Sequence, residues 1–215
     1  MEAYQIPLFP LNTVLFPGMP LPLHIFEERY KEMINWCLAE KRPFGVSLIR
    51  AGVAEGGPLP EPHAVGCTAQ ITQVQSLSQG RLFLMAVGHE RFRIRALHHD
   101  RPYLVGEVEP YPLLPESSAI LQNPVKNLYP LVVDYLDILA TLGEVEFDIN
   151  QIPRDHRSLP YLAAALIQIP AEQKQTLLAA ARTSTLLTDL YSIYREQTAI
   201  LRLMPRGDQE TFSLN

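Results

Sequence analysis

The sequence predicts an α+β fold, with a β-rich first half that one helix interrupts and a helical second half. Three observations support this assignment. Short apolar segments, either alternating with polar residues or continuous, follow one another up to residue 111. A proline-rich segment then occupies residues 112–123. Beyond it, apolar residues recur every three or four positions, as they do on one face of a helix.

The composition is typical of a globular protein with a modest negative charge. The chain has 215 residues, of which 47% are hydrophobic and 19% charged. It therefore has enough apolar surface to fold as one large domain or two small ones. With 18 basic and 23 acidic residues the formal net charge is −5, which disfavours a nucleic-acid-binding surface.

The first half contains five segments with the pattern of β-strands and one with the pattern of a helix. The strands are expected at Phe44–Ile49, Cys67–Val74, Leu82–Val87, Phe92–Leu97 and Leu104–Glu109. Ser78–Arg81 has the composition of a hairpin turn, and 89–91 is expected as an exposed connection between two strands. The helix is expected over Glu27–Ala39. Short strands at regular spacing predict a closed or nearly closed antiparallel barrel.

The second half carries the start signals of four helices. These signals are Asn123 followed by Pro124, then Ser158, Pro170, and Thr183 or Ser184. We therefore expect a barrel subdomain over residues 1–111, a linker over 112–123, a helical bundle over 124–205 and a tail over 206–215.

Common catalytic and cofactor-binding motifs are absent from the sequence. It contains no GxxxxGK[ST], HExxH, GxSxG or SxxK pattern. The cluster His98-His99-Asp100 is a weak metal candidate, because adjacent residues on a strand point to opposite faces. Cys37 and Cys67 are too few for a disulfide framework and are expected to be buried thiols. We expect no enzyme activity, no catalytic residue, no cofactor and no metal.

Neither a signal peptide nor a membrane span is predicted. Prolines interrupt the apolar N-terminal stretch, whereas a signal peptide needs a continuous apolar core. No run of about 18 apolar residues occurs, as a membrane-spanning helix would need. The expected location is the cytoplasm, away from membranes.

The N-terminal run IPLFPLNTVLFPGMPLPLHIFEERY, residues 6–30, resembles the opening of the Lon protease N-terminal domain family. Further segments resemble that family in the same order, namely Val65–Ile71, Gly80–Ile94 and Pro102–Val108. The resemblance covers nearly the whole chain. It implies a PUA-like (pseudouridine synthase and archaeosine transglycosylase-like) antiparallel β-barrel followed by a helical bundle, in a standalone member without ATPase or peptidase modules.

The resemblance also implies a function, because this domain of Lon helps to recognise substrates. It implies a non-enzymatic module that binds unfolded or exposed apolar segments of proteins and assists protein quality control, with a protease or chaperone as a further partner. RNA binding, by analogy with PUA-like domains, is the alternative, and an enzyme with scattered catalytic residues is a third; the oligomeric state stays open. Candidate peptide-binding residues are Phe16, Met19 and Leu21, which flank a Pro-Gly turn, and burial in the barrel is the alternative for them.

Overall fold

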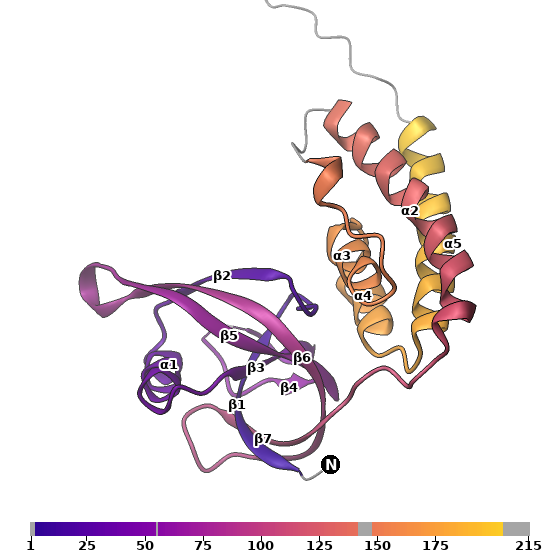
Figure 1. Ribbon diagram of the computed structural model, residues 1–215. Coiled ribbons are helices and arrows are strands. Elements are labelled where there is room, and N and C mark those ends of the chain that lie inside the picture. Colours follow the sequence, from indigo (N-terminus) through magenta and orange to yellow (C-terminus); the bar gives the residue numbers. More distant parts are fainter. Residues whose placement is uncertain (1–2, 55, 142–147, 204–215) are drawn as a thin grey trace, which may run out of the picture.

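The computed structural model describes residues 3–54, 56–141 and 148–203, and divides them between a β-barrel and a group of helices beside it (Figure 1). Strands occupy the first half of the chain, with one long helix among them, and helices occupy the second half. The α+β fold predicted from the sequence is confirmed. The tail expected over 206–215 lies outside the described residues, as do residues 204 and 205.

A closed sheet forms the barrel. Its described strands are β1 (Tyr4–Leu11), β2 (Pro20–Ile25), β3 (Phe44–Ala51), β4 (Glu61–Pro62), β5 (Val65–Ser76), β6 (Leu82–His98) and β7 (Leu104–Pro110). β1, β7, β6, β5 and β3 pair in that order, and β3 pairs with β1 again. This pairing closes the ring of five strands on itself, so that none of the five is an open edge. β2 is added along β6, and β4 along β3.

Two details of the barrel differ from the expectation. β1 and β3 pair in parallel, with Leu8 opposite Gly45, because the chain between them returns through the helix α1 (Glu28–Glu40) and not through a hairpin. The two strands expected over 82–97 are the single strand β6, and the connection expected at 89–91 lies within it. Irregularities in its pairing with β5 and β7 let β6 bend where the sequence had predicted a break.

Gly88 marks the point where β6 meets the loop that leads into β2. Its N–H donates to the carbonyl oxygen of Met19 at 2.9 Å, and its own carbonyl accepts from the N–H of Gly18 at 2.8 Å. A Cβ at Gly88 would lie 2.1 Å from the carbonyl oxygen of Phe16. Only glycine permits this approach, so Gly88 fixes the loop at residues 16–19 against the barrel.

The helices form two layers beside the barrel. They are α2 (Ser118–Thr141), α3 (Leu159–Leu166), α4 (Ala171–Leu178) and α5 (Thr183–Leu203), and short 3-10 turns lie at Ser78–Gly80 and Ile149–Gln151. α2 and α5 lie side by side, with α3 and α4 between them and the barrel (Figure 1). The rings of Tyr135 and Tyr194 meet edge to face at 5.2 Å, and the hydroxyl of Tyr194 donates to the carbonyl oxygen of Ala163 at 2.9 Å. These contacts tie α5 to both α2 and α3.

The first of these helices begins earlier than predicted. Pro124 lies inside α2, and Pro130 follows it in the same helix, so the assignment of Pro124 to the first turn was wrong. Each proline lacks the N–H that would donate to the carbonyl four residues earlier. Those carbonyls belong to Ile120 and Lys126, which are exposed, so water can take the place of the missing donor. α2 therefore begins within the segment expected as a linker.

The core of the helical half extends into the barrel. The same buried cluster that holds α2, α3 and α5 together includes four barrel residues, namely Val14, Phe16, Leu48 and Val65. Burying a large aliphatic or aromatic side chain stabilises a fold by about 1.5–3 kcal/mol. The two halves are therefore held together by shared apolar burial as well as by the polar contacts described next.

Candidate binding groove between the barrel and the helices

Arg91 joins the two halves from inside their seam. The residue is 4% exposed, and its Nη1 donates to the carbonyl oxygens of Leu178 at 2.6 Å and Ala180 at 2.7 Å. These carbonyls lie at the C-terminal end of α4, where the helix dipole places partial negative charge. The hydroxyl of Tyr111 donates to Ala179 at 3.2 Å in the same segment. The strand β6 and the residues after it thus bind the end of α4.

The charge of Arg91 is stabilised by dipoles and aromatic rings. Among the described residues no carboxylate forms an ion pair with it. Its guanidinium carbon lies 5.0 Å from the ring centre of Tyr111 and 5.9 Å from that of Tyr161, within the range of cation–π attraction. Burial lowers the pKa of Arg91, and the neighbouring tyrosines oppose that shift. An arginine remains protonated under such conditions, so the seam contains a buried positive charge.

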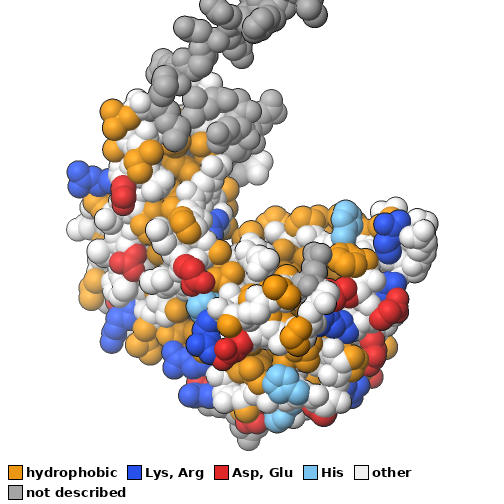
Figure 2. Space-filling view, turned by 180° about the vertical axis from the view of Figure 1, so that it is seen from behind, with side chains coloured by type: hydrophobic (Ala, Val, Ile, Leu, Met, Phe, Trp, Pro, Cys, Tyr) orange, Lys and Arg blue, Asp and Glu red, His pale blue; other side chains and the backbone are white. Residues whose placement is uncertain are grey.

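A groove of about 700 Å³ opens beside this seam, between the loop at residues 17–20 and α3. Figure 2 shows the notch that separates the helical half from the barrel. The walls are largely apolar and include Pro17, Met19, Pro20, Pro153, Tyr161, Leu162, Ala165 and Leu166. A second hollow of about 370 Å³ adjoins it, since Pro17 and Tyr161 line both. The apolar groove thus continues into a smaller hollow that His89, Glu90 and Arg91 also line.

The rim of the groove is positively charged. Within the described part of the chain, Arg157 is the one charged residue that lines it, and no ion pair or side-chain hydrogen bond engages its guanidinium. The nearby carboxylate of Asp155 instead accepts from the backbone N–H groups of Arg157 and Ser158, at 2.8 and 2.9 Å. Asp155 therefore stabilises the turn just before α3, and the exposed guanidinium of Arg157 is left without a partner among the described residues.

The strand beside the groove is protected against pairing with another strand. Among the described strands, β2 pairs only with β6. Pro20 and Pro22 alternate along it, and proline has no N–H to donate. The N–H groups of successive residues in a strand point to opposite sides. If Leu21 and Leu23 direct theirs toward β6, the positions that would donate from the free edge of β2 are the prolines, which have no N–H. A partner in the groove is expected to bind through side chains and not by extending the sheet.

The three candidate residues from the sequence occupy different places. Met19 is half-buried and lines the groove. Phe16 is 0% exposed within the core of the helical half, and Leu21 is 5% exposed within the barrel core. Only Met19 can therefore touch a partner as the structure stands. Tyr161 and the leucines of α3 were missed, because apolar residues at helical spacing give the same pattern whether they face a core or a groove.

The other groups considered for chemistry are the possible metal ligands and the two cysteines. No group of three or more His, Cys, Asp or Glu residues in the described ranges is placed to hold a metal ion. Cys37 and Cys67 are free and buried, and burial raises the pKa of each thiol to about 12. None of the described helices combines the length and apolar character needed to cross a bilayer.

Two solved structures with a similar fold are N-terminal domains of Lon-type proteins. The N-terminal domain of Mycobacterium avium complex Lon protease aligns with a TM-score of 0.70 at 18% identity, covering 90% of this chain and 99% of that one. A Lon N-terminal domain protein from Xanthomonas campestris aligns with a TM-score of 0.61 at 24% identity, covering 94% and 99%. At these identities the likeness shows the fold.

The family follows from the sequence model that matches the chain. The model described as the ATP-dependent protease La (LON) substrate-binding domain covers residues 5–195. The chain belongs to this family, as the resemblance of its N-terminal run had indicated.

Two curated relatives carry the name Lon protease. The Lon protease of Anaeromyxobacter dehalogenans is 23% identical over 208 residues, which is 94% of this chain and 24% of the relative. The Lon protease of Koribacter versatilis is 28% identical over 180 residues, which is 82% of this chain and 22% of the relative. The chain thus spans about a quarter of the length of these relatives.

Proposed function

We propose that the groove binds exposed apolar segments of unfolded or partly folded proteins. The observation that carries the proposal is an open, apolar hollow at the seam of a domain whose family is described as substrate-binding. Folded monomers seldom leave such a surface uncovered unless something binds there.

Each apolar contact in the proposed complex contributes little free energy, so useful affinity requires several contacts at once. Burial of one large apolar side chain contributes about 1.5–3 kcal/mol at most, and ordering of the segment offsets part of it. A segment with two or three large apolar residues would therefore bind at micromolar to millimolar concentrations. Such affinity suits a module that samples many unfolded clients.

The proposed role is non-enzymatic. The bound segment would pass to a partner that supplies the chemistry, either a protease or a chaperone in the cytoplasm, as part of protein quality control. RNA binding has less support as a function of this groove, because its lining is apolar and the chain carries a net charge of −5.

The test is titration of the chain with fluorescently labelled, reduced and carboxymethylated lactalbumin at low and high salt. Met19→Ser is expected to weaken binding about fivefold, since it removes an apolar contact worth about 1 kcal/mol. Ile120→Ser is the matched control, because Ile120 is an exposed apolar residue of α2 outside the groove. Affinity should survive high salt, as screening does not affect apolar burial. A collapse with salt, or an equal effect of both variants, would overturn the proposal.

A further inference from the structure

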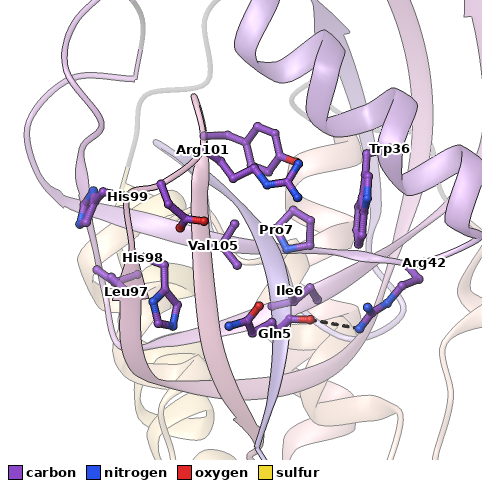
Figure 3. Close-up of a pocket in the computed structure, with 12 residues that line it drawn as sticks. Gln5, Ile6, Pro7, Trp36, Arg42, Leu97, His98, His99, Arg101 and Val105 are labelled. Carbon is purple, nitrogen blue, oxygen red and sulfur yellow. Dashed lines mark hydrogen bonds between the residues drawn. The ribbon is translucent and has the colours of Figure 1, made fainter.

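A second concave site lies in the barrel half, apart from the groove. It has a volume of about 520 Å³ and is built from β1, the end of α1, the end of β6 and the segment that leads into β7 (Figure 3). This volume is in the range of small-molecule sites. Unlike the groove, its lining is rich in charged and aromatic side chains.

Basic side chains predominate around this hollow. Arg42, Arg101, His98 and His99 line it, against the single acid Asp100. Figure 3 shows Arg42 on one side and the two histidines on the other, with Arg101 between them. Two acids lie just outside the lining: the carboxylate of Glu107 is 4.0 Å from Nε2 of His98, and Glu32 is near enough to the lining residue Tyr103 to add to the rise that burial causes in the pKa of that tyrosine. The charged residues of the lining itself are therefore two arginines and one aspartate, in a chain of net charge −5.

The two arginines keep donors free for a ligand. Nη2 of Arg42 donates to the carbonyl oxygen of Gln5 at 3.1 Å, which fixes the side chain while leaving its other N–H groups available. Arg101 is exposed and forms no ion pair with the described residues; its side chain hydrogen-bonds that of Tyr103, which leaves its other N–H groups available. Two arginines around one hollow are suited to phosphate or carboxylate oxygens.

Trp36 supplies the aromatic wall of the hollow. It is the only tryptophan of the sequence and is half-buried on α1. The guanidinium carbon of Arg42 lies 5.7 Å from its ring centre, and Figure 3 shows Trp36 and Pro7 facing the same space. A flat heteroaromatic ring can stack in such a place, where every base presents a π-face.

We propose that this hollow binds a nucleoside phosphate, with the base against Trp36 and the phosphate between Arg42 and Arg101. A free mononucleotide and the 5′-phosphorylated end of an RNA strand share this chemistry. The site is separate from the groove, so the inference does not depend on the function proposed there.

The intrinsic fluorescence of Trp36 provides the measurement, because no other tryptophan contributes. The chain is titrated with AMP, adenosine, inorganic phosphate and a short RNA with or without a 5′-phosphate. AMP is expected to change the emission saturably, and adenosine and phosphate to bind at least about tenfold more weakly. A preference for AMP or for the phosphorylated RNA end identifies the source of the ligand.

Variants distinguish AMP binding in this hollow from nonspecific attraction of anions to surface arginines. Arg101→Gln is expected to weaken AMP binding about tenfold, whereas Asp100→Asn should strengthen it two- to fivefold by removing a like charge. Arg195→Gln is the control, since Arg195 is an exposed arginine of α5. All three positions are exposed, and thermal melting checks that each variant is folded. No saturable response to AMP or to the RNA end, equal affinity for phosphate alone, or equal effects of Arg101→Gln and Arg195→Gln would overturn the proposal.

Discussion

Nη1 of Arg91 lies 2.6 Å from the carbonyl oxygen of Leu178, so a buried cation of the barrel is bonded to the end of a helix in the other half. The two residues are 87 positions apart in the sequence. A second bond from the same nitrogen reaches Ala180 at 2.7 Å. This pair of bonds sets the position of α4, and therefore of the neighbouring helix α3 that lines the groove.

Arg91→Met is expected to destabilise the fold by about 2–3 kcal/mol. The substitution keeps an apolar stem but leaves two buried carbonyls without a donor, each at a cost of about 1–3 kcal/mol, partly offset because a buried charge is removed. Urea unfolding gives the change in free energy. Arg95→Met is the matched control, because Arg95 is exposed on the same strand and its ion pair with Glu109 contributes about 0–1 kcal/mol. Equal losses in the two variants would contradict the assigned role of Arg91.

Gly88→Ala is expected to weaken both stability and groove binding. Its Cβ would meet the carbonyl oxygen of Phe16 at 2.1 Å, a backbone atom that can move only with the loop at residues 16–19. Gly18→Ala in the same loop is a graded comparison. Gly18 has φ +81°, and a Cβ at this position would meet nothing within 4 Å, so only the backbone preference of about 1 kcal/mol is lost. Thermal melting and client titration should both rank Gly88→Ala as the more damaging change.

Arg157→Glu is expected to change the choice of client more than the stability. An exposed, unpaired cation at the rim of an apolar groove favours segments that carry an acidic residue beside their apolar ones. Peptides that differ only in one flanking Asp or Lys provide the measurement. The natural chain should prefer the Asp peptide about threefold at low salt, and Arg157→Glu should reverse that order. An unchanged preference would show that Arg157 does not face the bound segment.

Most of the fold was predictable because the spacing of hydrophobic residues along the chain differs between strands and helices. The strands at 44–49 and 104–109 and the helix starts after Ser158 and Pro170 lie where the pattern places them. The parallel pairing of β1 with β3 could not be predicted in this way. The alternation of apolar and polar residues along one strand does not indicate the direction of the strand beside it. Pro124 was misassigned because proline, although common in the first turn of a helix, also occurs inside helices, as it does here in α2.

The candidate site was less predictable than the fold. Met19 could be found from the exposed geometry of a Pro-Gly turn, but Tyr161 contributes through the packing of α3 against the barrel. The sequence placed Arg91 on the surface, and this was wrong, because its partners are carbonyls at Leu178 and Ala180. The residues next to an arginine in the sequence do not indicate that it will bind backbone carbonyls almost 90 positions away.

Acid should weaken the start of α5 through Glu116. Its carboxylate accepts from the hydroxyl of Ser184 at 2.5 Å and from the N–H of Ser184 at 2.9 Å, and these hydrogen bonds lower the pKa of Glu116 from its ordinary 4.5. Because the folded pKa lies below the unfolded one, the stabilisation is present above about pH 4.5 and is lost as pH falls through the folded value.

The melting temperature followed from about pH 5 to about pH 3 checks this prediction. Glu116→Gln should show a shallower fall than the natural chain, because it lacks the carboxylate that must be protonated. Glu196→Gln, a change at an exposed glutamate of α5, should keep the natural slope. Identical slopes in the chain and in Glu116→Gln would contradict a role for this cap.

The two thiols are expected to be inert until the barrel opens. Cys37 and Cys67 are 1% and 0% exposed, and burial raises the pKa of each to about 12, so the reactive thiolate is scarce at pH 8 as well as inaccessible. Reaction with a chromogenic disulfide should be at least about 100-fold slower in buffer than in urea, where both thiols react. In Cys37→Ala the only remaining thiol is that of Cys67, which lies on a strand of the closed sheet. The labelling rate of Cys67 in this variant therefore reports the opening of the barrel. Fast labelling of that variant under native conditions would show that β5 does not stay paired between β3 and β6.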